Sequence, residues 1–331
     1  MLTLLAAVAL AGVAAGTGLL PSGSTPVVAM ADESVAPSAA AVDSQEAYSD
    51  VATLQPVTPL ASAQTAGERW GVDRVNAAAA VQSAGALAPV LVAVVDTGID
   101  ASHPALAGRV VASIDLTASG TTADENGHGT HMAGTIAAIA PNAQFLNVKS
   151  ADSRGRCNTE TVAAAIRWAA DNGAQIINVS LEVAPSTELQ NAISHAWQKG
   201  AVIIAAAGNS GATSEAYPAA YAEAIAVAAT NQDNGLAVLS NHGDWVDIAA
   251  PGQKILAEFP TGGLGYETGT SPAAAHVSGV ASLLVSLAED ESGDGLSNDE
   301  VRKALEGSAR PLSLSGTGSG LVDALAAIQA L

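Results

Sequence analysis

The sequence predicts an α/β fold: a doubly wound, mostly parallel sheet with helices on both faces. Short apolar runs without polar alternation are interspersed with segments of helical length, which is typical of parallel strands buried on both sides. The chain has 331 residues, of which 49% are hydrophobic and 13% charged. That length and composition suit one large globular domain and exclude a disordered chain or a repeat array.

The expected strands are short runs rich in Val, Ile, Leu and Ala. They cover residues 90–95, 144–148, 175–179, 201–207 and 224–228. Segments 159–172 and 187–199 are the expected helices between them, the second ending at Lys199 and Gly200.

Three polar residues directly follow expected strands. Asp96 follows the first strand, and Ser180 and Asn209 follow the third and fourth. In doubly wound sheets, ligands bind at the carboxyl ends of the strands. We therefore expect these side chains at one edge of the sheet.

The first 66 residues differ in composition from the rest. Residues 2–20 are apolar and uncharged, and residues 28–31 (VAMA) have the small-x-small form of a cleavage site, so residues 1–31 are predicted to be a signal peptide of a secreted protein. No basic residue precedes Arg69, whereas signal peptides normally begin with one, so either the true start lies upstream or the segment is an uncleaved anchor of marginal length. Residues 32–66 are rich in Ala, Ser, Pro and acid and predict a linker or short pro-segment. The globular domain is expected over residues 67–331.

The charge balance limits the partners. Twelve basic against 32 acidic residues give a net charge of −20, which disfavours nucleic acid and anionic membrane surfaces as stable partners. Cys157 is the single cysteine, so no internal disulfide can form. A nucleophilic role for Cys157 is disfavoured because no His lies near it in sequence, although flanking arginines would lower its pKa.

Three short motifs carry Asp96, His128 and Ser271, in that order. The motifs read VAVVDTGID over 92–100, NGHGTHMAG over 126–134 and GTSPAAAHVSG over 269–279. A serine hydroxyl becomes a good nucleophile when an imidazole takes its proton and a carboxylate orients that imidazole. Asn209, in the segment AAAGNSG, and the backbone amide of Ser271 could stabilise an oxyanion. The set predicts a serine hydrolase.

Each motif also has a purely structural interpretation. An Asp at a strand end often starts a turn. His128 and His131 could form a metal pair, but the spacing and the missing Glu differ from those of zinc proteases. Glycines beside His128 are expected to leave room for a substrate. Ser271 could simply be an N-cap followed by Pro272 at the first helical position.

Read together, the motifs resemble the subtilisin-like serine proteases, the subtilases, over nearly all of residues 67–331. The resemblance implies that Asp96 orients His128, that His128 acts as general base and then acid, and that Ser271 forms an acyl-enzyme. It implies further that Asn209 and the Ser271 amide hold the oxyanion. The substrate would pair as an added strand along residues 180–183 (SLEV), where the family usually has Gly residues after Leu. The implied substrate-binding residues are Ser180, Leu181, Glu182, Ala206, Ala207, Gly208 and Ala216.

Two departures from the family pattern bear on activity. Glu182 and Val183 should narrow or charge the pocket that binds the substrate residue before the scissile bond. One expected outcome is a preference for basic substrate residues at that position. The alternative is that Glu182 points into solvent. Pro272 replaces the usual Met after the nucleophile. This change predicts peroxide resistance, and would strain the site if Ser271 had to be helical.

The calcium sites of the family are expected to be reduced. The Asn-rich insertion after the helix of His128 is missing, and Ala105 replaces the usual Asp, so we expect no strong calcium site and no required cofactor. A weak cation site near residues 219–221 remains open. The acidic loop 290–295 lacks a Glu at the twelfth position of a calcium loop, and residues 297–300 predict a capping box instead.

The overall prediction is a secreted serine endopeptidase that acts as a monomer on protein or peptide substrates. The alternative is a pseudoprotease that keeps the fold and binds peptides without turnover, because Pro272 and residues 182–183 change positions where geometry matters.

Overall fold

A parallel sheet of seven strands forms the centre of the molecule. The computed structural model describes residues 55–57 and 69–331, so the predicted signal peptide and most of segment 32–66 lie outside the described residues. The strand order is β3-β4-β2-β5-β6-β7-β8, with every neighbouring pair parallel. The strands are β2 (Val90–Asp96), β3 (Val110–Asp115), β4 (Ala143–Lys149), β5 (Ile176–Val179), β6 (Val202–Ala206), β7 (Ala224–Thr230) and β8 (Ile248–Pro251).

All five predicted strands are confirmed, and two strands at the sheet edges were missed. In β3 half-buried and exposed positions partly alternate, because this strand has only one neighbour, and the run does not read as a continuous apolar segment. In β8 only four residues, ending at Pro251, form the strand. Short or half-exposed edge strands lack the pattern that identifies the central ones.

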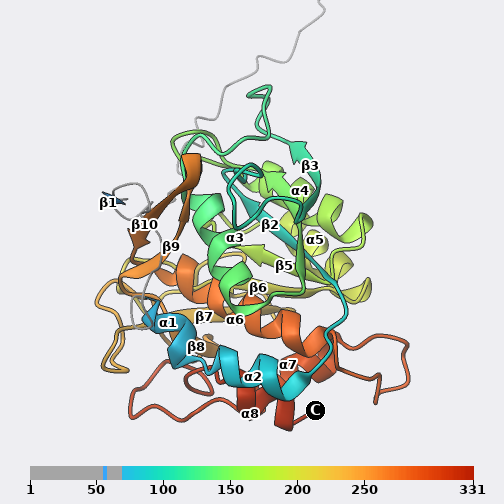
Figure 1. The fold of residues 1–331 in the computed structure, drawn as a ribbon, viewed down its shortest axis with the longest axis vertical. Coiled ribbons are helices and arrows are strands. Elements are labelled where there is room, and N and C mark those ends of the chain that lie inside the picture. Colours follow the sequence, from blue (N-terminus) through green and yellow to red (C-terminus); the bar gives the residue numbers. More distant parts are fainter. Residues whose placement is uncertain (1–54, 58–68) are drawn as a thin grey trace, which may run out of the picture. The chain divides into compact units, whose positions relative to one another are not determined.

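Helices cover both faces of the sheet, as predicted (Figure 1). On one face Val92 and Val94 of β2 join the core of α3 and α6, and on the other Ala93 and Val95 join that of α4 and α5. The helices are α1 (Trp70–Arg74), α2 (Ala77–Ala84), α3 (His128–Ile139), α4 (Thr159–Asp171), α5 (Thr187–Gln198), α6 (Thr270–Val285), α7 (Asn298–Gly307) and α8 (Ala324–Gln329). In α6 every residue from Thr270 to Leu284 is buried, which makes it the central helix.

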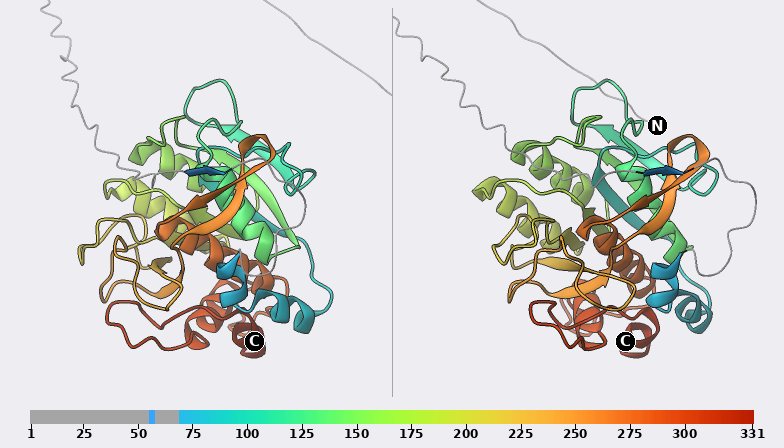
Figure 2. Two further views of the ribbon diagram at one scale, coloured as in Figure 1. Left: turned by 60° about the vertical axis from the view of Figure 1, so that its left-hand side comes forward. Right: turned by 90° about the vertical axis from the view of Figure 1, so that its left-hand side faces the viewer.

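A second, antiparallel sheet joins the N-terminal region to the start of α6. It has the order β1-β10-β9, with β1 (Gln55–Val57), β9 (Ile255–Phe259) and β10 (Gly263–Glu267); the 3₁₀ turn η1 (Pro260–Gly262) links the last two. Figure 2 shows β1 beside β10, at the edge of the hairpin. A piece of the predicted 32–66 segment therefore forms a strand, which its composition did not indicate.

Among the described residues, no helix has both the length and the apolar character needed to cross a membrane.

Candidate active site

Asp96 and His128 meet at the carboxyl edge of the parallel sheet. Asp96 is the last residue of β2 and His128 the first of α3, and Nδ1 of His128 lies 2.7 Å from Oδ1 of Asp96. Both side chains are buried. The ring nitrogen faces a carboxylate oxygen, so Nδ1 donates the proton and Nε2 is directed away from Asp96.

The glycines on either side of His128 allow close packing of the protein around the start of α3. A methyl group added at Gly129 would lie 2.1 Å from the carbonyl oxygen of Gly98 and 3.1 Å from Cβ of Asp96. One added at Gly127, whose φ is +111°, would lie 2.2 Å from the ring of Phe259. Only glycine lets α3 start this close to β2.

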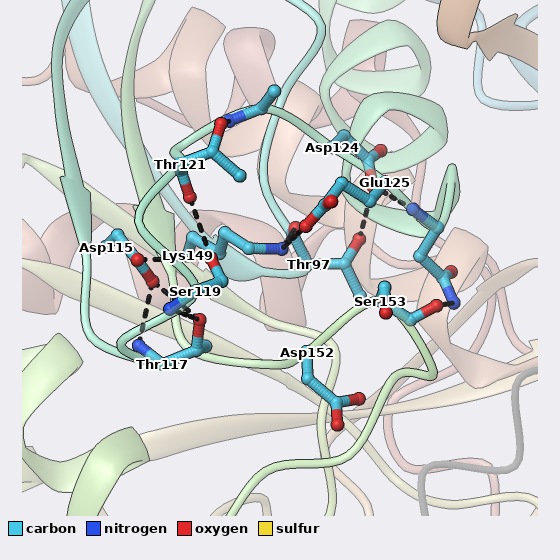
Figure 3. A network of polar contacts seen from close by, with 12 residues as sticks. Thr97, Asp115, Thr117, Ser119, Thr121, Asp124, Glu125, Lys149, Asp152 and Ser153 are labelled. Carbon is cyan, nitrogen blue, oxygen red and sulfur yellow. Dashed lines mark hydrogen bonds and ion pairs between the residues drawn. The ribbon is translucent and has the colours of Figure 1, made fainter.

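A second carboxylate, that of Asp124, fixes the loop that enters α3 (Figure 3). Its Oδ1 accepts from Thr97 Oγ1 at 2.9 Å and from the backbone amide of Gly127 at 2.8 Å. Its Oδ2 accepts from the amide and hydroxyl of Thr130, at 2.8 and 2.6 Å. Sequence reasoning missed Asp124, although an Asp a few residues before a helix is a common capping signal.

The neighbourhood of Asp96 also contains Lys149 and Cys157. The Lys149 Nζ is buried and donates to the Thr97 carbonyl at 2.5 Å, and Figure 3 shows it reaching along this loop toward Glu125. Burial, with Asp96 and Asp152 nearby, raises the pKa of Cys157 to about 12. The thiol therefore stays protonated near neutral pH and does not fit a nucleophile.

Ser271 lies in the first turn of α6 and is not its N-cap. Gly269 is the N-cap, so Ser271 and Pro272 are the second and third helical residues. Pro272 is tolerated there because first-turn amides have no partner within the helix. The Ser271 hydroxyl donates to the Ser180 carbonyl at 3.4 Å. Within residues 69–331, no hydrogen bond joins Ser271 to His128.

The Nε2 edge of His128 is occupied by Glu267, the last residue of β10. Oε1 of Glu267 lies 3.1 Å from Nε2 of His128, and Oε2 lies 3.3 Å from Nδ1 of His131. Burial disfavours the imidazolium, but the carboxylates of Asp96 and Glu267 outweigh it and raise the pKa of His128 well above its ordinary value. The sequence does not predict the contact between His128 and Glu267, because α3 and β10 are far apart along the chain and meet only in the folded protein.

Asn209 is held against the start of α6 by its carbonyl oxygen. Oδ1 accepts from the backbone amide and the hydroxyl of Thr270, at 2.8 and 3.0 Å. The Thr270 hydroxyl in turn accepts from the amide of Gly208 at 3.0 Å. These contacts leave the Asn209 amide group as the donor end of a side chain fixed next to Ser271.

Side chains of the predicted substrate-binding strand point alternately into the core and away from it. Leu181 and Val183 are buried in the core of α4 and α5, and Val183 pairs with Tyr217. Glu182, between them, turns the opposite way: its Oε2 lies 2.8 Å from the position of a methyl group on Gly208, which would also lie 3.4 Å from Cβ of Ala216. The carboxylate therefore lies against the predicted pocket wall, which argues against the solvent-facing alternative.

The other predicted substrate-binding residues gather near this edge, but some turn their side chains inward. The backbone carbonyl of Ser180 accepts from the Ser271 hydroxyl, and the Ser180 hydroxyl donates to the Ser271 carbonyl at 3.4 Å. Ala206 and Ala207 are buried in separate cores, and Leu181 is buried as well, so these residues can offer a substrate mainly their backbone.

The segment after α3 is short, as the missing Asn-rich insertion predicts. α3 ends at Ile139 and β4 begins at Ala143, so only residues 140–142 connect them. Asn142 uses its amide nitrogen to donate to the carbonyls of Ala88 and Ser282. Across residues 69–331, no group of three or more His, Cys, Asp or Glu side chains is placed to hold a metal ion.

The capping box predicted over residues 297–300 is wrong. Ser297 is the N-cap residue of α7 but makes no side-chain capping hydrogen bond. Glu300 instead accepts from the amides of Glu291 and Ser292, at 3.2 and 3.0 Å. Its carboxylate closes the preceding loop because those amides have no partner in a regular element.

Comparison with known proteins agrees with the observed fold. The sequence model of the subtilase family matches residues 88–323. Thermitase of Thermoactinomyces vulgaris is 42% identical over 252 residues, covering 72% of this chain and 88% of thermitase. Subtilisin BL of Lederbergia lenta is 40% identical over 269 residues, covering 78% of this chain and 97% of subtilisin BL. Alkaline elastase YaB of Bacillus sp. (strain YaB) is 37% identical over 297 residues, covering 86% of this chain and 76% of the elastase.

A parallel α/β sheet with this match defines a serine-type endopeptidase. The chain belongs to the subtilase family.

Proposed function

We propose that the chain hydrolyses peptide bonds through a triad of Asp96, His128 and Ser271. The observation that carries the proposal is the buried 2.7 Å contact between Asp96 and His128 Nδ1 at the end of β2. Ser271, in the first turn of the central helix, contacts Ser180, which follows the neighbouring strand β5. In that contact Asp96 fixes the tautomer in which Nε2 of His128 can accept a proton.

The reaction then follows from the groups at this edge. Ser271 Oγ turns from the Ser180 carbonyl toward His128, gives its proton to Nε2 and attacks the peptide carbonyl carbon. Asp96 stabilises the imidazolium that forms. The oxyanion is held by the side-chain amide of Asn209 and the backbone amide of Ser271. Collapse breaks the C–N bond, His128 protonates the leaving amine, and water releases the acyl group by the same steps.

Glu182 supports a preference for a basic side chain before the scissile bond. Its carboxylate lies beside Gly208 and Ala216, which line the proposed pocket. A cationic substrate side chain would meet this carboxylate, whereas an acidic one would be repelled. Cleavage profiles of a peptide library should show enrichment of Lys and Arg that is lost in Glu182→Gln. Glu188→Gln, an exposed carboxylate in α5, is the matched control and should keep the profile. An identical profile for Glu182→Gln would contradict the preference.

We further propose how the chain is organised and where it acts. We assign residues 1–31 to a signal peptide, residues 32–66 to a linker or short pro-segment and residues 67–331 to the catalytic domain. The enzyme is exported and acts as a monomer on protein or peptide substrates. It requires no cofactor, and residues 219–221 are the place to test for a weak cation site.

Replacement of the nucleophile tests the proposal directly. Ser271→Ala should lower kcat on casein by about six orders of magnitude, because the acyl-enzyme cannot form. Ser282→Ala is the matched control and should stay active, because it removes a buried hydroxyl about three turns further along the same helix. A fluorophosphonate should label the unaltered chain once, at Ser271. Peptide binding without labelling or turnover would favour the pseudoprotease alternative.

A further inference from the structure

Glu267 is a buried carboxylate next to Nε2 of His128, the nitrogen that would accept the proton in the proposed reaction. It is 2% exposed and ends β10, four residues before Ser271. Its two oxygens face one nitrogen of His128 and one of His131. A buried carboxylate of this kind requires compensation by a proton or a charge, since burial of an uncompensated ion is costly.

The hydrogen bonds of the two histidines show where the proton must be. Nδ1 of His128 donates to Asp96, and Nε2 of His131 lies 3.0 Å from the carbonyl of Ile255, to which it donates. In their neutral forms both rings would therefore present a lone pair to Glu267. At least one added proton is needed between Glu267 and the two rings.

The surrounding charges place that proton on His128. Burial lowers the pKa of His131, which keeps this ring neutral. Burial would raise the pKa of Glu267, but the charge of His128 holds it below its usual value. The titratable groups facing this cluster come from β2, the loop before α4, α3, β9, α6 and β10: Asp96, Cys157, His131, Glu258, His276 and Glu267. Glu258 is itself paired with Arg69 at 2.7 Å, and the Cys157 thiol is protonated.

We propose that Glu267 is a positioning residue that holds His128 as an imidazolium, apart from Ser271, and thereby sets the lower pH limit of catalysis. In this state Asp96 and Glu267 each hold one nitrogen of the ring, and the Ser271 hydroxyl donates to Ser180. When His128 loses its added proton, the attraction between Nε2 and Glu267 is lost and Nε2 becomes available to accept from Ser271. The inference rests on the proposed triad and adds a fourth residue that acts through His128.

The sign of the pH effect follows from the charges. A carboxylate next to the ring favours the charged imidazole, so catalysis, which needs the neutral ring, begins at higher pH than it would without Glu267. Replacing Glu267 with Gln keeps the size of the side chain and removes the charge. The acidic limb of kcat/KM against pH should move down by roughly 1–3 pH units, the effect of one close opposite charge.

The experiment compares pH profiles of kcat/KM for the unaltered enzyme, Glu267→Gln and Glu258→Gln on one peptide substrate. Glu258→Gln removes a buried carboxylate from β9 of the same hairpin, which pairs with Arg69 and does not contact His128. The acidic limb should shift down in Glu267→Gln and stay in place in Glu258→Gln. An unshifted limb in Glu267→Gln, or equal shifts in both variants, would overturn the proposal.

A second measurement does not depend on turnover. In the Ser271→Ala background, NMR titration of the His128 ring should show the imidazolium persisting to higher pH with Glu267 than with Gln at that position. If Glu267→Gln does not fold, the test moves to Ser271→Ala alone, in which the His128 ring and the Glu267 carboxyl should titrate together. Separate titrations would overturn the role of Glu267. Coupled titration in a chain that never hydrolyses peptides would instead count against the triad.

Discussion

Thr270 orients the Asn209 side chain of the proposed oxyanion site. Its hydroxyl accepts from the Gly208 amide and donates to Asn209, while its own amide donates to the same Asn209 oxygen. The Asn209 side chain is therefore oriented before any substrate arrives, which is the condition under which a donor stabilises a transition state well.

Loss of the Asn209 donor should affect the transition state more than binding. Asn209→Leu is expected to lower kcat by about 10²–10³-fold with little change in KM, because the oxyanion forms only during the reaction. Steady-state kinetics on a peptide substrate measure both constants. A rise in KM with unchanged kcat would show that Asn209 binds substrate and does not stabilise the oxyanion.

The residue after Ser271 predicts behaviour in oxidants. Pro272 carries no sulfur, and Met132, the methionine of the described residues, is fully buried in α3. Activity should survive dilute peroxide, whereas Pro272→Met should lose activity as the thioether becomes a sulfoxide beside the nucleophile. Residual casein hydrolysis after timed exposure makes the comparison. Rapid inactivation of the unaltered enzyme that a sulfoxide reductase reverses would contradict this expectation.

At the scale of elements, the contact between α3 and α6 depends on Gly279. A methyl group there would lie 2.8 Å from Cβ of Ile139. Overpacking costs about 1–3 kcal/mol, whereas the better helix propensity of Ala returns about 1 kcal/mol, so Gly279→Ala should be destabilising.

Gly307→Ala is the matched control for Gly279→Ala. Gly307 ends α7, and a methyl group there would meet no atom within 4 Å. This variant should be neutral or stabilised by up to about 1 kcal/mol. Urea unfolding measures both changes. Equal stabilisation of the two variants would show that the α3–α6 contact has room to adjust.

The sequence predicts the central elements well because both faces of β2, β5 and β6 are covered. Their continuous apolar runs also place Asp96 at a strand end. The β9–β10 hairpin was missed, since its glycines and mixed residues give no clear period, and Glu267 was missed with it. Its partner His128 belongs to another element, so the contact exists only once the chain has folded.

At the scale of the whole molecule, stability should not depend on a strongly bound calcium ion. The connection between α3 and β4 is three residues long and its Asn142 amide bonds two carbonyls. A bound ion adds stability according to its concentration and affinity, and its removal would lower Tm. Thermal unfolding with excess chelator and with added calcium should give the same Tm. A large drop with chelator would point to a site that lies elsewhere.

The central position of α6 has a consequence for synthesis. Ser180 and Ser271, which contact each other, are 91 residues apart, and α6 packs against strands made much earlier. A chain made from its N-terminus presents Asp96 and His128 long before the serine exists. Cores that depend on such distant contacts form late and slowly. If the proposed triad acts, the nascent chain has no nucleophile next to its base, and it should not cleave neighbouring chains on the ribosome until the helix that carries Ser271 has been inserted.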